Sequence, residues 1–484
     1  MASPARLERL TPKSVDFDKW YIELVRQAEL ADYAPVKGCM VIRPYGYALW
    51  EHIQDALDGM IKATGHENMY FPLLIPESYL AKEAEHVEGF APEVAWVTHG
   101  GSKELEERLA IRPTSETIIC SMYADWIHSY RDLPVLINQW VNVYRWEKRT
   151  RLFLRTSEFL WQEGHTFHET EKEATEEVEK MLDCYATLAR DWLALPIVSG
   201  TKTRSETFAG AVYTRSIEAM MSDGWALQAG TSHNLGQHFT QAYGITFRNR
   251  ENTESYPFQT SWGLSTRIIG AVIMAHGDDT GLILPPKVAP VQIVVVPIPA
   301  GGDDDMNNRI EDIASRFEKA NGLSCRIRVD RRDGIRPGEK FAHWELRGVP
   351  LRITIGKRDV ESGVVSVTRR VDGVTEQMGI DACIDAIPTL LEDAHKRLQS
   401  RSLAMLEAKS CDVTSMDALA EAFAHEPVFA SSPFCNRPEC EEQIKEHVHA
   451  VTIRVLRDDR KGEGAPCIAC GAPSDKVALI ARAY

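Results

Sequence analysis

The segment YRWEKRTRLFLRTSEFLWQEGHT, residues 144–166, mixes charges of both signs with aromatic rings at nearly every position. A solvated helix would place opposite charges four residues apart and collect its aromatic side chains on the other face, and this segment does not sort in that way. We therefore expect two strands, over 135–146 and 152–161, joined by the polar turn EKRTR.

Charged and aromatic side chains gather on one face of these expected strands. A spacing of two residues places Arg145 and Glu147 on the same face, and a spacing of four does the same for Arg155, Phe159 and Glu163. Such a face offers guanidinium groups for phosphates, a ring for stacking on a base, and carboxylates for an amine or a metal. The sequence has no GxxxxGK[ST] loop, which argues against a P-loop enzyme. The pattern suits an ATP-dependent site on an antiparallel sheet.

The flanking segments predict helices and short strands. A helical spacing covers 14–32, with Ser14 as its N-cap, and a longer amphipathic helix covers 47–65, closed by Gly65. A short strand follows in MYFPLLIP, and further helices are expected over 171–195 and in STRIIGAVIMAHG. Antiparallel strands flanked by helices indicate an α+β fold.

The composition changes at ILPPKVAPVQIVVVPIPAG, where two prolines precede a new buried strand. The pattern then predicts a helix over 307–320, a strand over 324–329, a helix over 339–347, strands over 351–355 and 364–369, and a closing helix. This order is typical of a small α/β domain, which a helical linker joins to a last domain. The expected boundaries are 1–285, 286–395 and 396–484.

Composition narrows the class of protein. The chain has 484 residues, a hydrophobic fraction of 44% and a formal net charge of −15, which argue for a globular protein and against a general nucleic-acid coat. No apolar run is long enough for a bilayer, and the start MASPARLERL does not resemble a secretory signal. We expect a cytoplasmic protein that makes no membrane contact.

Four of the ten cysteines cluster near the C-terminus. Cys435 and Cys440 have four residues between them, and Cys467 and Cys470 have two. This spacing predicts a structural, tetrahedral Cys₄ zinc site, with two disulfides or free thiols as the alternative. The other six cysteines are scattered, as expected for buried thiols in a reducing compartment.

Three ordered segments resemble the motifs of class II aminoacyl-tRNA synthetases. GHENMYFPLLIP, residues 65–76, resembles motif 1 and ends at the expected Pro76; residues 144–163 resemble motif 2; GLSTRIIGAVIMAHGDD resembles motif 3, with Arg267 heading its helix. RPTSETI, WQEGHT and QAGTSHNLGQ are similar to the prolyl-tRNA synthetases of the archaeal and eukaryotic-like type. The resemblance extends over nearly the whole chain, including the cysteine cluster.

The resemblance implies a class II antiparallel sheet flanked by helices, an α/β anticodon-binding domain and a small α/β zinc-binding domain. The implied reaction joins L-proline and ATP into prolyl-adenylate and then transfers proline to the terminal adenosine of tRNA(Pro). Two anions meet in the first step, so cationic side chains and Mg²⁺ must neutralise charge. Arg145 and Arg267 are the implied catalytic residues. The implied ATP-binding residues are Arg145, Glu147, Arg155, Thr156, Phe159, Gln228, Thr231, Ser265 and Arg267.

The resemblance also implies a proline pocket. A secondary ammonium has two hydrogens and needs two acceptors, and a flat ring needs an aromatic wall. The implied proline-binding residues are Thr114, Ser115, Glu116, Arg145, Trp161, Glu163, His165, Phe208 and His233. Taken singly, Arg145 could be a surface arginine, and Phe159 and Trp161 could be core residues.

A locally basic stretch, residues 328–359, lies in the expected anticodon-binding domain, where it could also be an ordinary solvated face. Glu345, Arg347 and Lys357 are candidates for contacts with the guanines of a proline anticodon. The resemblance of motif 1 implies a homodimer. In related enzymes the terminal residue reaches toward the active site, so the carboxylate of Tyr484 is a candidate for ordering it, with a frayed terminus as the alternative.

Motifs 2 and 3 lie too close together to contain a large editing domain, so we expect little hydrolysis of alanyl-tRNA by this chain. One alternative is another class II synthetase; a threonyl enzyme would need a catalytic Cys/His zinc site in the first domain, and a seryl enzyme an N-terminal coiled coil. The other is a synthetase-like protein without catalysis, which would be expected to lose Arg145, Glu147 or Arg267.

Overall fold

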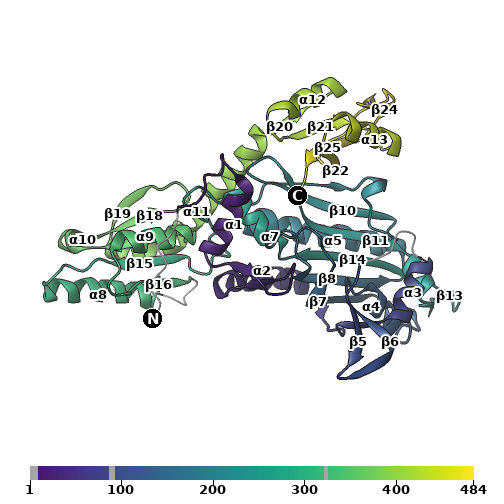
Figure 1. Ribbon diagram of the computed structural model, residues 1–484, viewed down its shortest axis with the longest axis horizontal. Helices are drawn as coiled ribbons and strands as arrows, with labels where there is room; N and C mark the ends of the chain where they lie inside the picture. Colours follow the sequence, from purple (N-terminus) through teal and green to yellow (C-terminus); the bar gives the residue numbers. More distant parts are fainter. Residues whose placement is uncertain (1–8, 87–92, 321–324) are drawn as a thin grey trace.

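The computed structural model describes residues 9–86, 93–320 and 325–484 (Figure 1). Within these residues the largest sheet has eleven strands. In sheet order they are β20 (Ser410–Asp412), β21 (Phe429–Pro433), β25 (Val477–Arg482), β22 (Val451–Arg457), β9 (Ile197–Thr201), β10 (Tyr213–Met220), β11 (Ala226–Gly236), β14 (Phe258–Ser265), β8 (Glu158–His168), β7 (Val135–Tyr144) and β3 (Glu67–Asn68). From β22 to β7 all neighbours are antiparallel, and only the outer pairs β20–β21 and β3–β7 are parallel. The predicted α+β class is confirmed.

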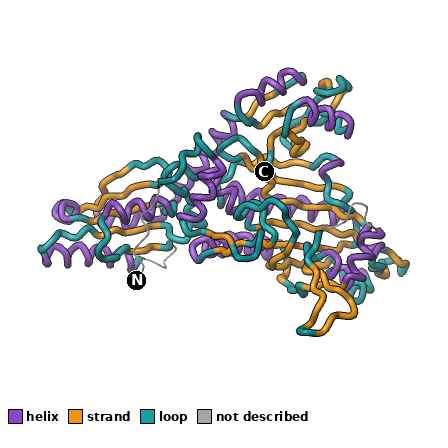
Figure 2. Tube along the Cα trace, viewed as in Figure 1, coloured by secondary structure: helices purple, strands orange, loops and turns teal. Residues whose placement is uncertain are grey.

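Helices and short strands surround the central part of this sheet (Figures 1 and 2). The elements are α1 (Phe17–Gln27), β1 (Ala31–Tyr33), β2 (Met40–Ile42), α2 (Pro44–Ala63), β4 (Leu74–Pro76), α3 (Glu77–His86), β5 (Trp96–Gly100), β6 (Lys103–Ile111), α4 (Glu116–Tyr123), α5 (Glu171–Thr187), α6 (His238–Ala242), β12 (Phe247–Arg248), β13 (Glu254–Ser255) and α7 (Arg267–His276). Helices α5 and α7 pack on β11 and β14, and the main core includes Trp20, Trp50, Tyr185 and Trp262.

Helix α5 shows how local sequence sets these elements. Thr170 and Glu173 form a capping box, in which each side chain accepts a hydrogen bond from the other residue's backbone N–H. The helix ends at Thr187 and continues as a π-helical turn, Leu188–Trp192, so the expected helix over 171–195 is interrupted. Tyr185 donates to Gln162 at 2.6 Å, which places α5 on the face of β8 opposite its odd-numbered residues.

Two helix starts differ from the sequence expectation. The N-cap of α1 is Asp16, whose carboxylate accepts from the backbone N–H of Lys19 at 2.9 Å, so the prediction of Ser14 is wrong. Helix α2 begins at Pro44, three residues before the expected start, because proline suits the first turn of a helix. Its end is as expected, with Gly65 at a φ of 92° just beyond it.

The predicted strand over 152–161 is also wrong in its boundaries. Strand β7 ends at Tyr144 and β8 begins at Glu158, so Arg145, Glu147 and Arg155 lie in the connection between them. Leu152, Phe153 and Leu154 turn into the main core, and Phe153 has a φ of 61°. A regular strand would direct successive side chains to opposite faces of the sheet. The chain therefore bends here so that all three apolar side chains are buried in the main core. Strand β8 instead continues to His168.

A second, five-stranded sheet lies beside the first unit (Figure 1). Its order is β16 (Ile327–Val329), β15 (Ile293–Pro297), β17 (Leu351–Ile355), β18 (Val364–Arg369) and β19 (Thr375–Gly379), with helices α8 (Asp304–Lys319), α9 (Pro337–Leu346) and α10 (Lys357–Ser362). The expected α/β pattern is present, and the sequence analysis missed α10 and β19. Residue 324, the expected start of the second strand, lies outside the described residues.

The long helix α11 (Ile380–Ala408) runs from this second sheet to the C-terminal region. That region contains α12 (Met416–His425), α13 (Pro438–His447) and the hairpin of β23 (Ala465–Pro466) and β24 (Pro473–Ser474). Its strand β22 pairs with β9, through Leu456 opposite Thr201 and Arg457 opposite Gly200. The C-terminal strands therefore extend the first sheet. Among the described residues, every helix is too short or too polar to cross a lipid bilayer.

Candidate active site

A cavity of about 260 Å³ opens on the central strands. Thirteen of the predicted site residues line it: Thr114, Glu116, Arg145, Phe159, Trp161, Glu163, His165, Phe208, Gln228, Thr231, His233, Ser265 and Arg267. Most of them come from β8, β10, β11 and β14 or from the segments next to these strands. The odd-numbered residues of β8 face the cavity, as the period of a strand requires.

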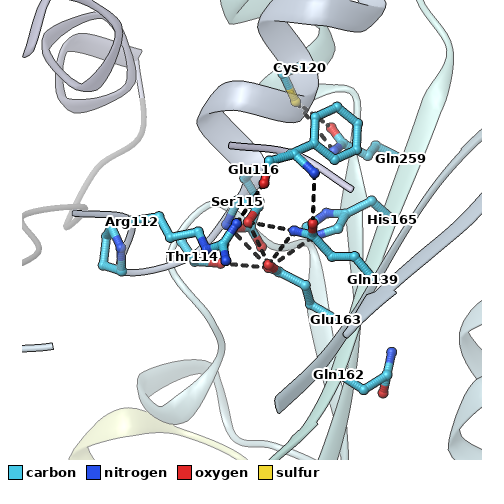
Figure 3. Close-up of polar contacts among 12 residues, drawn as sticks. Arg112, Thr114, Ser115, Glu116, Cys120, Gln139, Gln162, Glu163, His165 and Gln259 are labelled. Carbon is cyan, nitrogen blue, oxygen red and sulfur yellow. Dashed lines mark hydrogen bonds and ion pairs between the residues drawn. The ribbon is translucent and has the colours of Figure 1, made fainter. Parts of the chain in front are cut away.

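Two buried carboxylates, Glu116 and Glu163, line the cavity and lie in one network of polar contacts (Figure 3). Glu163 accepts hydrogen bonds from Ser115 Oγ at 2.5 Å, Gln139 Nε2 at 2.7 Å and the Ser115 backbone N–H at 3.2 Å. His165 Nε2 lies 3.2 Å from Glu163 Oε2. Glu116 accepts from the hydroxyl of Thr114 and lies in the same cluster. The carboxylates of Glu116 and Glu163 and the imidazole of His165 are groups of the kind that bind metal ions. The carboxylate oxygens can equally accept hydrogen bonds from an ammonium group.

These hydrogen bonds stabilise the charged forms of Glu163 and His165 in the protein interior. Burial opposes ionisation of Glu163, but the hydrogen bond and positive charge of His165 outweigh it, so the pKa of Glu163 lies below its ordinary value. Burial also opposes protonation of His165, but the hydrogen bond to Glu163 and the negative charges of Glu116 and Glu163 together outweigh it, so the pKa of His165 is raised. The two directions agree on a buried carboxylate–imidazolium pair.

Two guanidinium groups also line the cavity. Arg145 Nε donates to the carbonyl of Pro113 at 2.9 Å, and Arg267 Nε donates to the carbonyl of Leu154 at 3.0 Å. Within the described part of the chain, neither arginine forms an ion pair. Burial lowers the pKa of Arg267, and the like charge of Arg145 lowers it further, yet a guanidinium stays protonated in proteins. Two guanidinium groups that have no ion-pair partner among the described residues make this cavity suited to an anion.

Aromatic rings line the same cavity. The guanidinium carbon of Arg145 lies 5.2 Å from the ring centre of Trp161 and 5.6 Å from that of Phe159. The rings of Phe208 and His233 lie 4.8 Å apart. Burial lowers the pKa of His233 to about 3, so this imidazole is neutral and its Nδ1 lies 2.9 Å from the hydroxyl of Thr214.

Four predicted site residues do not line the cavity. Ser115 lies behind it as a partner of Glu163, and Thr156 is buried, with its hydroxyl donating to the carbonyl of Glu158 at 2.8 Å. Arg155 and Glu147 form an ion pair of 2.8 Å in the connection after β7. Their nucleotide contacts stay predictions.

The sequence analysis missed several residues of the cavity. Lys202 and Glu206 line it from the β9–β10 connection, Thr214 lines it from β10, and Ser261 and Trp262 line it from β14. The two β14 residues had a usable signal, because they directly precede the segment that resembles motif 3. Lys202 had none, since no motif in the sequence indicates its ion pair with Glu218 on β10. Ser261 Oγ and Trp161 Nε1 are buried without a hydrogen-bond partner among the described residues, as expected if a ligand supplies one.

The three candidates for tRNA contact lie in the second sheet domain but not in one cluster. Arg347 pairs with Glu29 of the first unit and stacks 5.1 Å from the ring centre of Tyr45, so it joins two domains. Lys357 is exposed and lies 3.1 Å from Asp303. Glu345 lines a separate cavity of about 450 Å³ together with Asp278 and Arg370. Their tRNA contacts stay predictions.

The four C-terminal cysteines meet in space. All four sulfur atoms lie within 4.8 Å of one another, with Cys435 Sγ 3.5 Å from Cys440 Sγ and 3.8 Å from Cys470 Sγ. Tetrahedral zinc with Zn–S bonds of about 2.3 Å requires sulfur separations of about 3.8 Å, so the thiols fit that metal. The backbone N–H of Ala472 and the thiol of Cys440 lower the pKa of Cys470 to about 7, whereas burial raises the pKa of Cys435 and of Cys440, so the fit to metal rests on the geometry. The cluster indicates structural zinc.

Three family models match the chain. Residues 96–276 match the tRNA synthetase class II core domain (G, H, P, S and T), residues 292–390 match an anticodon binding domain, and residues 416–484 match the C-terminal domain of prolyl-tRNA synthetase. The proline–tRNA ligase of Alkaliphilus oremlandii is 50% identical over 478 residues, which are 99% of this chain and 98% of that protein. The chain belongs to the prolyl-tRNA synthetase family. It is a proline–tRNA ligase with a class II core and an anticodon-binding domain, so these predictions are confirmed.

Other members of the prolyl-tRNA synthetase family agree. The proline–tRNA ligase of Chlorobium chlorochromatii is 51% identical over 99% of this chain and 100% of its own length. The crystal structure of the prolyl-tRNA synthetase from Cryptosporidium parvum, complexed with halofuginone and AMPPNP, matches with a TM-score of 0.92 and 39% identity over 99% of this chain and 100% of that chain. The C-terminal match also argues against a threonyl, seryl or glycyl enzyme.

Proposed function

We propose that the cavity holds proline and ATP at the same time, with proline at the carboxylate end and the phosphates at the guanidinium end. A carboxylate oxygen of proline attacks the α-phosphorus, the bond from that phosphorus to the bridging oxygen breaks, and pyrophosphate leaves. A hydroxyl of the terminal adenosine of tRNA(Pro) then attacks the carbonyl carbon of the adenylate, and AMP leaves.

At the proline end, the secondary ammonium donates its two hydrogens to Glu116 and Thr114. Glu163 and His165 support this site electrostatically, with Ser115 fixing Glu163 from behind. Trp161, Phe208 and neutral His233 enclose the ring. The support is the burial of Glu116 beside aromatic walls, because a buried carboxylate is unfavourable without a cation close by and His165 already pairs with Glu163.

At the ATP end, Arg145 contacts the α-phosphate and the proline carboxylate, and Arg267 contacts the γ-phosphate. Phe159 stacks on adenine, Glu147 accepts from its amine, and Arg155 and Thr156 cover the nucleotide. Gln228, Thr231 and Ser265 line the remaining wall. Phosphates and water would hold most of the coordination shell of an Mg²⁺ ion bound to ATP, and Gln228 would offer it an amide oxygen.

We also propose the division 1–285, 286–395 and 396–484, with α11 crossing the second boundary as the linker helix. The middle domain reads the anticodon, with Glu345, Arg347 and Lys357 as candidate contacts. Exposed apolar side chains near motif 1, Tyr70 at 70% and Leu74 at 36%, support a homodimer through that region. We infer a cytoplasmic setting from the reduced thiols that a zinc cluster needs.

One observation carries this proposal: a single cavity is lined both by buried carboxylates and by two guanidinium groups that form no ion pair within the described residues. ATP–pyrophosphate exchange with a panel of amino acids tests it. Proline should give the highest kcat/KM by a wide margin. Equal exchange with threonine, serine or glycine, or no exchange with proline, would overturn it.

A further inference from the structure

The β9–β10 connection, residues 202–212, forms one wall of the amino-acid end of the cavity. It carries Lys202, Glu206 and Phe208, and Phe208 packs on the ring of His233. The C-terminal region lies next to this wall, because its strand β22 pairs with β9, the strand that leads into Lys202. A Cβ atom on Gly200 would lie only 2.2 Å from the carbonyl oxygen of Leu456, so the two strands meet without space for a side chain.

A buried charge cluster crosses this junction. Glu218 on β10 is fully buried and accepts from Lys202 Nζ at 2.7 Å, and from Arg454 Nε and Nη2 at 3.0 Å each. Ser216 adds a hydroxyl donor at 2.9 Å. Lys202 belongs to the cavity wall and Arg454 to the C-terminal region, so Glu218 joins the two. A fully buried carboxylate needs its cationic partners, because removal of one leaves charge uncompensated in a medium of low polarity.

The strand pairing is irregular next to this charge cluster. Arg454 is the extra residue of a β-bulge, since Ile453 pairs with Ile480 and Val455 with Leu479. A second bulge lies in the pairing of β10 with β11, where Ala229 of β11 is the extra residue opposite the step from Ile217 to Glu218. A bulge redirects a side chain at the cost of regular pairing, and the bulge at Arg454 lies where this side chain reaches Glu218.

A second contact holds the same wall from outside. Glu441 on α13 accepts from Ser205 Oγ at 2.6 Å, and Lys445 lies 3.5 Å from Glu206. Glu441 directly follows Cys440 of the cysteine cluster. The wall is thus held at Ser205 and Glu206 by α13 and at Lys202 by the charge cluster.

We propose that Arg454 and Glu441 are positioning residues for the amino-acid end of the cavity: they fix the wall formed by residues 202–212, and with it the fit to proline. Arg454 acts through Glu218 and Lys202, and Glu441 acts through Ser205. This inference rests on the proposed location of proline in the cavity. Neither residue lines the cavity, so both act on proline through the wall.

The test compares Arg454→Met, which keeps the apolar stem, with Arg454→Lys, which restores a cation. Arg457→Met is the matched control, because Arg457 lies on the same strand but pairs with Asp459 and Ser431 instead. KM for proline and for ATP are measured by pyrophosphate exchange, with thermal unfolding in parallel. Arg454→Met should raise the proline KM about tenfold, corresponding to about 1.4 kcal/mol, and leave the ATP KM within about twofold. Arg454→Lys should recover most of the loss.

Ser205→Ala keeps the test decisive if Arg454→Met does not fold, because Ser205 is exposed and loses only its hydroxyl. It should raise the proline KM by about twofold to fivefold and leave thermal unfolding unchanged. A wild-type proline KM in Ser205→Ala together with one in a folded Arg454 variant would overturn the inference, as would equal changes in the proline and ATP KM. Failure of the wild-type protein to exchange with proline would instead overturn the proposed function.

Discussion

His165 Nε2 lies 3.2 Å from Glu163 Oε2, and both side chains are buried at the same end of the cavity. This pair predicts a pH dependence of stability. The pKa of His165 is raised above 6.5 in the folded protein, so its stabilising contribution is complete below that pH and is lost as pH rises through the folded value. The pKa of Glu163 is lowered below 4.5, so its contribution is lost only in acid.

His165→Gln removes the first contribution. The variant should therefore be destabilised most at about pH 6 and progressively less toward about pH 9. Urea unfolding midpoints of variant and wild type, measured across this range, check the prediction. His449→Gln, at an exposed position, serves as the control. A difference between His165→Gln and wild type that grows with pH would contradict the charged pair.

Glu116→Gln keeps the shape of the side chain and removes the negative charge offered to the ammonium of proline. We expect the proline KM to rise at least about tenfold, equivalent to about 1.4 kcal/mol, with little change in the ATP KM. Pyrophosphate exchange at varied proline and ATP gives both constants. Glu158→Gln, an exposed change at the start of β8, should leave both unchanged. A loss confined to ATP would place the amino acid elsewhere.

The cysteine cluster predicts about one zinc atom per chain, bound by four thiolates. Cys470→Ser should reduce the bound zinc to nearly none and speed proteolysis of the C-terminal region, because the metal stabilises that fold. Metal analysis and limited proteolysis measure the two effects, with Cys411→Ser as a control outside the cluster. Full zinc content in Cys470→Ser would show that this thiol is not a ligand.

Gly164 lies on β8 against Trp262, and a Cβ atom at this position would come within 2.1 Å of the indole ring. Trp262 is only 1% exposed, so the ring has little room to move. We expect Gly164→Ala to lower the free energy of unfolding by about 1–3 kcal/mol. Gly59→Ala, in α2 with open space around it, should instead raise it by roughly 0.5–1 kcal/mol. Chemical denaturation distinguishes the two signs.

Much of the site could be predicted from sequence because it depends on local order. The side chains of residues 161–165 of β8 alternate between the two faces of the sheet, so Trp161, Glu163 and His165 are expected on one face. All three line the same cavity. Arg267 could be located in the same way, because it begins a helix directly after a strand. These positions follow from periodicity and helix boundaries.

The positions that could not be predicted depend on distant contacts. Residues 152–154 do not form the expected strand because their side chains are buried in the main core. The alternation of residues in this segment does not indicate that distant contact. Lys202 meets Arg454 through Glu218 only because β22 pairs with β9. Glu218 and Arg454 are 236 positions apart in the sequence. Such pairings are set by topology, which no spacing in the sequence records.

Arg145→Ala tests the central claim most directly, because this side chain is proposed to neutralise both the α-phosphate and the proline carboxylate. The rate of proline-dependent ATP–pyrophosphate exchange, at saturating proline and ATP, is the measurement. Loss of one such electrostatic contact should lower the rate by about 100-fold to 1,000-fold in a protein that still unfolds as the wild type does. A folded Arg145→Ala variant that exchanges at the wild-type rate would contradict the account.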